Sequence, residues 1–171
     1  MKKTNIVGHI PYLTTGDGNC LFNAASISLY GNESKSRLLK QITGKYFAAN
    51  SQRLRNHHAY YPFSQFFDES DLDTMRSCVV DGAYSNALTI LALVNALNIS
   101  VNSIYPPLNG HGDLAYQTLN ASIDPIENQA IKQITIMWSA AMLTPYGNEL
   151  VFKPNHYVAV LPSTYYIFTI I

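Results

Sequence analysis

The sequence predicts an α+β domain, and three observations support this prediction. Apolar residues recur at helical spacing in the first half of the chain, whereas short β-prone runs bounded by proline and glycine follow in the second half. Helices that precede strands, rather than alternate with them, are typical of α+β domains and not of repeating βαβ sheets. The chain has 171 residues without an internal repeat or low-complexity linker, so we expect a single domain over residues 1–171.

Two helices are expected in the first fifty residues. The first begins near Cys20 and closes at Gly31, because residues 21–29 carry apolar side chains at helical spacing. The second has Ser34 as its N-cap and an apolar face within residues 38–47. Both helices should therefore pack one face against the rest of the domain.

The middle of the chain is less regular. Residues 51–67 are rich in histidine, tyrosine and phenylalanine and are broken by Pro62, which predicts an irregular or weakly helical segment. The acidic stretch 68–75 leads to a further helical turn near Met75. Residues 85–97 are apolar nearly all round, and such a pattern is typical of a helix surrounded by protein. We expect this last segment to be the central buried helix.

Three strands are expected in the second half, at residues 99–105, 133–139 and 156–162. Two prolines at 106–107 end the first of them, and proline- and glycine-bearing turns separate the other two. The closing run 163–171 is β-prone and uncharged, which indicates either a last strand or an exposed chain end.

Charge and composition exclude several classes of function. Lys plus Arg and Asp plus Glu both number 11, so the formal net charge is 0 and no overall field favours nucleic acid or an anionic membrane. No apolar run reaches the roughly 20 residues of a membrane span, and the N-terminus has no continuous apolar core of a secretory signal. We therefore expect an intracellular protein, cytoplasmic or nuclear, in a reducing compartment.

The two cysteines, Cys20 and Cys78, lack the close spacing of paired metal ligands and form no disulfide framework. We expect neither a metal nor a cofactor, and Cys78 is interpreted as a small buried hydrophobe. Cys20 differs because it follows the turn-forming residues 16–19 and opens the first predicted helix. A helix N-terminus and a nearby imidazolium both lower a thiol pKa, and free backbone N–H groups of such a loop can bind an oxyanion. Cys20 is thus predicted to be a nucleophile held as a thiolate.

A cysteine nucleophile needs a base, and five histidines are available. His156 stands at the start of a predicted strand just beyond a loop, where a rigid element can aim it at the thiol. His57 and His58 lie in a polar, aromatic stretch and are expected at the surface, and His111 lies between glycines in a loop. We therefore assign His156 as the base.

Three motifs resemble the OTU (ovarian tumour) family of papain-like cysteine proteases, which cleave ubiquitin from proteins. GDGNCLFNAAS resembles the nucleophile motif, NHYVAV the histidine motif, and DGAYSNALTILALVNALNISVNSIY the block between them. The resemblance runs over residues 12–161 and is nearest to the branch of vertnin and related animal and mobile-element proteins. It implies a papain-like α+β fold in which a small β-sheet packs between helices.

The same resemblance assigns roles to individual residues. It implies Cys20 as the nucleophile, His156 as general base and then acid, and Asp17 as the loop acid that shapes the oxyanion hole. Gly82 and Tyr84 match the block that lines the channel for the glycine-rich ubiquitin tail, and a narrow groove admits glycine while rejecting larger side chains. As alternatives, Asp17 acts only as a helix cap and Tyr84 only as packing. The aromatic residues expected in the core are Trp138 and Tyr157.

One position departs from the family pattern. Most members carry Asp or Asn two residues after the histidine to fix its tautomer, whereas this chain has Val158, which cannot accept a hydrogen bond. Asn155, which precedes His156, is expected at the substrate groove and is also one candidate for the missing orienting residue. The other candidates are Thr135, Ser139 and Asn5.

Two functions follow from these assignments. The first is a deubiquitinating thiol hydrolase that cleaves the isopeptide or peptide bond after the C-terminal glycine of ubiquitin or a ubiquitin-like protein through an acyl-enzyme. The alternative is a catalytically weak or inactive OTU-like module that binds ubiquitin or another protein as part of a larger chain. Cys20 and His156 favour the hydrolase, and Val158 favours the binding module. Neither function requires nucleic acid, a membrane, a metal or a cofactor.

Overall fold

The structure is a computed structural model that describes residues 8–66, 70–109, 112–140, 144–146 and 149–163. The α-helices are α1 (Cys20–Tyr30), α2 (Ser36–Asn56), α3 (Asp71–Val79), α4 (Ala87–Leu97) and α5 (Leu114–Leu119). The 3-10 helices are η1 (Glu33–Lys35) and η2 (His58–Phe66). The strands are β1 (His9–Tyr12), β2 (Ser100–Ile104), β3 (Ser122–Ile123), β4 (Gln133–Ser139), β5 (Thr144–Tyr146), β6 (Glu149–Val151) and β7 (His156–Pro162).

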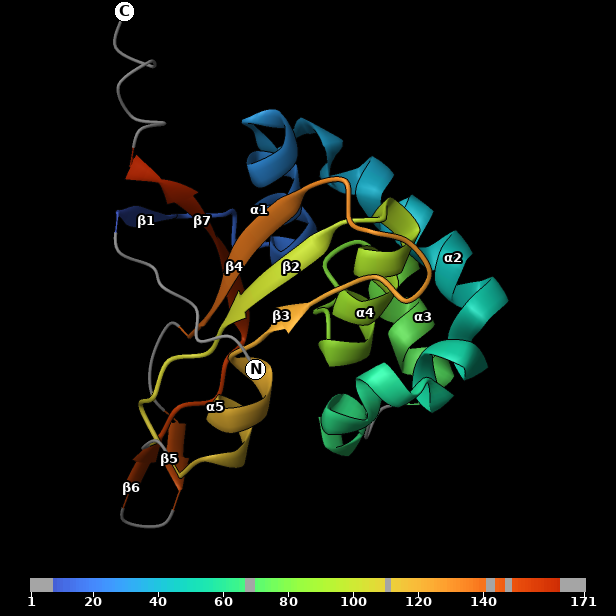
Figure 1. The fold of residues 1–171 in the computed structure, drawn as a ribbon. Coiled ribbons are helices and arrows are strands. Elements are labelled where there is room, and N and C mark those ends of the chain that lie inside the picture. The colour runs from blue at the N-terminus through green and yellow to red at the C-terminus, as the bar shows by residue number, and fades with distance from the viewer. Residues whose placement is uncertain (1–7, 67–69, 110–111, 141–143, 147–148, 164–171) are drawn as a thin grey trace, which may run out of the picture.

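Five strands form one sheet in the order β1-β7-β4-β2-β3, and β5 pairs with β6 in a separate hairpin. Only β2 and β4 run parallel, because the chain between them includes α5 and β3. Figure 1 shows α2, α3 and α4 on one side of this sheet, with α5 near the β5-β6 hairpin at one end. Strand β7 thus lies between β1 from the N-terminal part of the chain and β4.

Two helices, α1 and α4, are buried on almost every side. In α1 every residue from Cys20 to Ile27 is buried, and in α4 the same holds from Ala87 to Val94. Helix α1 packs on β7 and β4, and α2 packs along α4. The expected burial of the 85–97 helix is confirmed, but α1 shares the central position with it.

Aromatic side chains fill the core between these helices and the sheet. Trp138 donates its indole N–H to Ser103 Oγ at 2.8 Å, and Tyr157 donates its hydroxyl to the backbone carbonyl of Ser85 at 2.9 Å. Both rings are therefore buried with their polar ends satisfied, as buried Trp and Tyr require. Their predicted place in the core is confirmed.

The predicted elements agree with the structure where the sequence pattern is long. Strands β4 and β7 have the expected bounds, and β2 lies within the expected 99–105 segment. Residues 51–56 extend α2 and most of the following segment forms η2, so the irregular interpretation of 51–67 is wrong for its first part. Residues 164–171 lie outside the described residues, as do Asn5 and His111.

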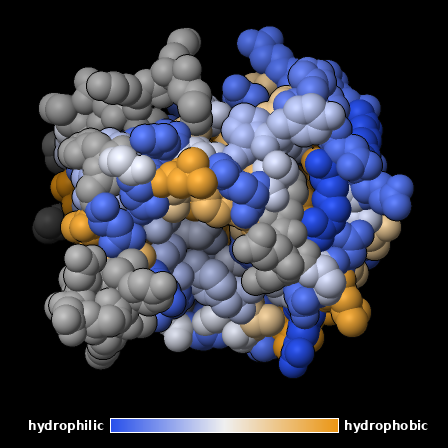
Figure 2. Space-filling view, turned by 90° about the horizontal axis from the view of Figure 1, so that it is seen from below, coloured by the Kyte–Doolittle hydropathy of each residue, from blue (hydrophilic) through white to orange (hydrophobic). Residues whose placement is uncertain are grey.

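In the view of Figure 2, hydrophilic and hydrophobic side chains are mixed around a central hollow. Neither kind forms a broad continuous patch in this view. Among the described residues, no helix is both long and apolar enough to span a bilayer. The buried apolar residues lie mainly in the core formed by α1, α4 and the sheet.

The buried tyrosines make the fold sensitive to alkaline pH. Burial raises the pKa of Tyr60 from 10.0 to about 12, although Asn95 donates a hydrogen bond to its hydroxyl. Between pH 10 and 12 the unfolded chain releases this proton and the folded chain keeps it, so stability falls as pH rises. The loss amounts to about 2–3 kcal/mol for this one group.

We therefore expect the free energy of unfolding to drop steeply between pH 10 and 12, and Tyr60→Phe to make that drop smaller. Tyr61→Phe is the matched control, because Tyr61 is 60% exposed. Urea denaturation at several pH values measures both slopes. Equal pH dependence in the two variants would contradict the assignment to Tyr60.

Candidate active site

Cys20 is the first residue of α1, and only 1% of its surface is exposed. Burial raises the pKa of its thiol above the usual value, although backbone N–H groups of Tyr157, Leu21 and Cys20 itself work in the opposite direction. The N–H groups at the helix start thus lower the thiol pKa, which is the direction predicted for them. The prediction of a lowered pKa is nevertheless wrong in this structure, because the sulfur lies inside the hydrophobic core and burial outweighs those contacts.

Asp17 organises the loop before the helix. Its carboxylate accepts hydrogen bonds from the backbone N–H of Asn19 at 2.9 Å and from the side-chain amides of Asn19 at 3.2 Å and Asn23 at 3.1 Å. Burial alone would raise the pKa of Asp17, but these donors outweigh it and lower the pKa. Asp17 is not the helix cap, because the N-cap residue is Asn19 and its side chain makes no capping bond.

Asn19 joins this loop to two other parts of the chain, and sequence reasoning gave it no role. Its amide nitrogen donates to Asp81 Oδ1 at 2.8 Å, while its amide oxygen accepts from Lys40 Nζ at 2.6 Å and from the Gly82 N–H at 3.3 Å. Lys40 lies on α2 and is 5% exposed, and burial lowers the pKa of its ammonium group. The buried cation and the carboxylates of Asp17 and Asp81 thus share one polar cluster around Asn19.

Gly18 and Gly82 meet backbone to backbone within this cluster. Both have positive φ, +82° and +78°, and a Cβ atom added at Gly18 would lie 1.9 Å from the Gly82 carbonyl oxygen. Only glycine fits at position 18 without displacing the 81–82 turn. The loop before Cys20 is therefore fixed against the turn that precedes α4.

His156 is the first residue of β7 and is partly buried. Its ring Nε2 lies 2.9 Å from Thr14 Oγ1, and Thr14 also donates its hydroxyl proton to the backbone carbonyl of Tyr157. Thr14 is 8% exposed and follows β1 by two residues. The sequence alone did not identify Thr14, because its place depends on how β1 pairs with β7.

Cys20 and His156 are brought together at the backbone of Tyr157. The Tyr157 N–H contacts the Cys20 sulfur, and His156 is the residue directly before it. Among the described residues, no hydrogen bond joins the sulfur to the imidazole in this conformation. The Cys20 thiol therefore lies next to the residue that follows His156 in β7.

Asn5 lies outside the described residues, and Asn155, Thr135 and Ser139 form no side-chain hydrogen bond with the His156 ring among the described residues. Ser139 lies directly across from His156 in the β4-β7 ladder. Its backbone carbonyl accepts a hydrogen bond from the Asn155 N–H at 3.0 Å. Thr135 is four residues from Ser139 along β4, which corresponds to about 13 Å in a strand. Thr14 is the residue whose side chain reaches the ring.

A shallow depression of about 430 Å³ lies beside His156. Its lining residues are Leu13, Thr14, Gly16, Ser139, Ala140, Asn155 and His156. Asn155 therefore lines a depression next to His156, and its role at a substrate groove stays a prediction. Tyr84 is not in this lining, and its ring instead stacks on Tyr157 with centroids 5.4 Å apart while its hydroxyl donates to the Pro154 carbonyl at 3.4 Å.

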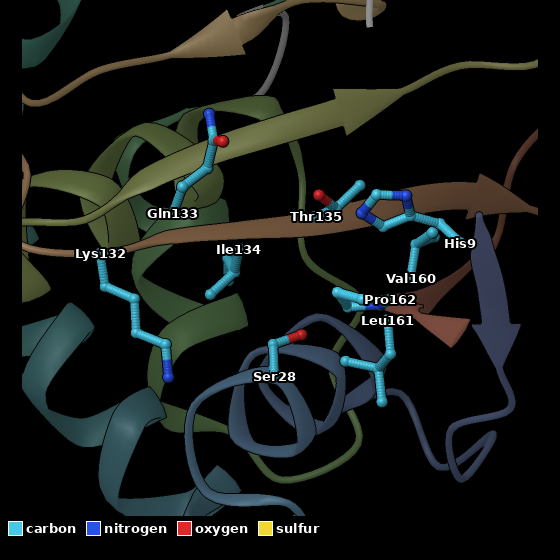
Figure 3. A pocket seen from close by; sticks show the side chains of 9 residues that line it. All are labelled: His9, Ser28, Lys132, Gln133, Ile134, Thr135, Val160, Leu161 and Pro162. Carbon is cyan, nitrogen blue, oxygen red and sulfur yellow. The ribbon is translucent and has the colours of Figure 1, made fainter. Parts of the chain in front are cut away.

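A second cavity, of about 170 Å³, lies between α1 and the strands β4 and β7 (Figure 3). Ser28 points into it from the last turns of α1, and its hydroxyl has no hydrogen-bond partner among the described residues. Ser28 is eight residues beyond Cys20 on the same helix, or about 12 Å along its axis. This cavity is thus separate from the thiol and imidazole.

Cys78 is buried like Cys20, but it does not stand at a helix start. It lies at the end of α3 with none of its surface exposed, and burial raises the pKa of its thiol to about 11. Among the described residues, no histidine contacts it. Its interpretation as a buried structural cysteine is confirmed.

A cysteine at the start of a buried helix, set against a strand that begins with histidine, places the chain among papain-like α+β proteins of the OTU class. A family model described as "Vertnin, OTU domain" matches residues 11–69 and 48–139. The chain therefore belongs to the vertnin OTU domain family. The matched residues include Cys20 and end before His156.

Solved structures support the same fold. The OTU domain of OTUD1 is similar over 90% of this chain and 85% of its own, with a TM-score of 0.54 and 20% identity. The viral OTU domain protease from Dera Ghazi Khan virus is similar over 92% of this chain and 84% of its own, with a TM-score of 0.55 and 15% identity. An OTU domain in complex with ubiquitin is similar over 89% of this chain and 69% of its own, with a TM-score of 0.55 and 14% identity.

These likenesses confirm the predicted α+β OTU fold. No curated protein matches the chain.

The contact of Gly18 with Gly82 predicts an unusual cost for adding one methyl group. Gly18→Ala should lower the free energy of unfolding by about 1–2 kcal/mol for the positive φ and by a further 1–3 kcal/mol for the clash. Gly31→Ala is the control, because Gly31 has nearly the same φ of +81° and no atom within 4 Å of the added Cβ. Urea denaturation compares the two, and equal losses would show that the 81–82 turn does not restrain the loop.

Proposed function

We propose that the chain is a thiol hydrolase that cleaves the isopeptide or peptide bond after the C-terminal glycine of ubiquitin or a ubiquitin-like protein. Cys20 is the nucleophile and His156 the general base, then the general acid. The observation that supports this most is the packing of α1, which begins at Cys20, on β7, which begins at His156. The ubiquitin-bound neighbour and the family membership support the choice of substrate.

The raised pKa of Cys20 determines the order of proton transfer. A buried neutral thiol gives up its proton to the His156 ring as the sulfur forms its bond to the carbonyl carbon. The protonated ring then donates that proton to the leaving amine as the carbon–nitrogen bond breaks, which leaves an acyl-enzyme. Water then attacks the thioester carbon while His156 takes a proton from it, and the carbon–sulfur bond breaks as the ring returns that proton to the sulfur. The glycine carboxylate leaves, and the neutral thiol and neutral ring are restored. The reaction needs no metal or redox partner.

The negative oxygen of the tetrahedral intermediate requires N–H donors near Cys20. The N–H of Asn19 is already taken by Asp17, so it cannot serve without breaking that bond. The N–H groups at the start of α1 and in the glycine loop are the remaining donors at this place. Asp17 thus contributes by fixing the loop, and its role is positional.

Substrate selection is assigned to the surfaces on either side of the thiol. The depression beside His156, with Asn155 in its lining, is one side. The loop and turn that meet at Gly18 and Gly82 are assigned the other, where a ubiquitin tail ending in glycine residues fits best because glycine carries no side chain. Tyr84 holds this side by packing on Tyr157.

A second candidate function is a ubiquitin- or protein-binding module with little activity. Two observations favour it: Cys20 is only 1% exposed, and Val158 stands where most OTU proteins carry an orienting Asp or Asn. Such a module would bind ubiquitin reversibly without forming a covalent bond.

A ubiquitin probe with an electrophilic C-terminus distinguishes the two. The hydrolase should capture the probe through Cys20, so Cys20→Ala should abolish capture while Cys78→Ala leaves it unchanged. His156→Ala should reduce capture at pH 7 by at least about 100-fold, within the range expected for loss of a general base. Gel shift and mass spectrometry give the readout. Reversible binding without capture by the unmodified chain would refute the hydrolase and support the binding module.

Alkylation by iodoacetamide tests the state of the thiol in the free protein. Only the thiolate reacts, and burial raises the pKa of Cys20 above 9.0, so the rate should rise about tenfold per pH unit through neutral pH. The Cys78→Ala variant isolates the signal from Cys20. A rate that levels off between pH 5 and 8 would instead indicate a thiolate and imidazolium pair at rest.

A further inference from the structure

We infer that the hydroxyl group of Thr14 is the positioning residue for His156, in place of the acid or amide that most OTU proteins carry two residues after the histidine. This inference rests on the proposed role of His156 as base. Thr14 Oγ1 is 2.9 Å from His156 Nε2, and the position two residues after the histidine is occupied by Val158.

The hydrogen-bond directions around Thr14 fix the tautomer of the imidazole. A threonine hydroxyl has one proton to donate, and Thr14 donates it to the backbone carbonyl of Tyr157, which can only accept. Toward His156, the Thr14 oxygen can then only accept, so Nε2 must carry the ring hydrogen. In the neutral ring this leaves Nδ1 with its free lone pair. Thr14 therefore presents Nδ1 as the base.

The β1-β7 ladder explains why Thr14 is in place. Tyr12 pairs with Ala159, and each step along this antiparallel ladder moves one strand forward and the other back. The same register, continued two residues, sets Thr14 opposite Tyr157. Strand pairing ends at Tyr12, and at Thr14 the side-chain hydroxyl donates to the Tyr157 carbonyl. Because threonine is branched at Cβ, its hydroxyl has few alternative directions.

Carboxylate and ammonium groups are absent from the described lining of the depression beside the ring, which consists of Leu13, Thr14, Gly16, Ser139, Ala140, Asn155 and His156 itself. Ser139 of β4 and Asn155 are neutral, and the Cys20 thiol is protonated at neutral pH because burial raises its pKa. The orienting partner of this histidine is thus a neutral hydroxyl instead of a carboxylate.

Thr14→Val removes the hydroxyl and keeps the shape of the side chain, and Thr14→Ser keeps the hydroxyl. We expect Thr14→Val to slow capture of the electrophilic ubiquitin probe by about 10- to 100-fold, and Thr14→Ser to restore most of the rate. Thr15→Val is the matched control, because Thr15 Oγ1 bonds to Glu33 on the surface and not to the site. Rates are followed from pH 5 to 9, since a loss of fold would lower them equally at every pH.

Nitrogen-15 NMR of the His156 ring supplies a readout that needs no activity. The unmodified chain should show hydrogen on Nε2, Thr14→Val a mixture of tautomers, and Thr14→Ser the original state. Hydrogen on Nδ1 in the unmodified chain would overturn the inference even if Thr14→Val fails to fold. A chain that shows the Nε2 tautomer, and loses it in Thr14→Val, supports the inference although no probe is captured, in which case the hydrolase proposal alone fails.

Discussion

The backbone of Tyr157 is the point on which the candidate site depends. In an antiparallel strand, the N–H and C=O of one residue point to the same neighbour. Beyond the end of β1 that neighbour is missing, and Cys20 and Thr14 occupy its place, one at the N–H and one at the C=O. A shift of β7 by one residue against β1 would turn Tyr157 out of the core and His156 away from this edge. Register is therefore a condition of the chemistry as well as of the fold.

The polar cluster around Asn19 has a related task on the other side of the thiol. A loop that precedes a buried helix start must satisfy its own N–H groups and carboxylates away from water. Asp17 and Lys40 carry opposite charges there, and Asn19 bonds to both of them. Asn19 also reaches Asp81 in the turn before α4. The loop is held from three directions, so the position of Cys20 depends on α2 and on that turn as much as on α1.

Much of the fold could be predicted because its signals are local. The 133–139 and 156–162 strands have long β-prone runs bounded by turn residues, and the structure keeps their bounds. Short elements such as β1 and β3 carry too few residues for a periodic pattern to stand out. The candidate nucleophile Cys20 and the candidate base His156 could be predicted because each lies within a short contiguous sequence motif.

The features that sequence could not give are those set by contacts between distant segments. Thr14 reaches His156 only because β1 and β7 pair in one register, and nothing near Thr14 in the sequence marks it as a partner of histidine. The thiol pKa was predicted from the helix start and a nearby imidazolium, whereas burial is the sum of many packed neighbours. The N–H groups at the helix start lower the pKa of Cys20, but burial by distant parts of the chain raises it by more.

The neutral orienting group and the raised thiol pKa are consistent with one another. A resting thiolate and imidazolium pair requires stabilisation of both charges, and this site supplies little for either. Burial disfavours the thiolate at Cys20, and a hydroxyl at Thr14 stabilises an imidazolium less than a carboxylate would. Burial therefore favours the neutral Cys20 thiol at rest. Charge would then separate only as the sulfur attacks, when N–H donors at the helix start can stabilise the new negative oxygen.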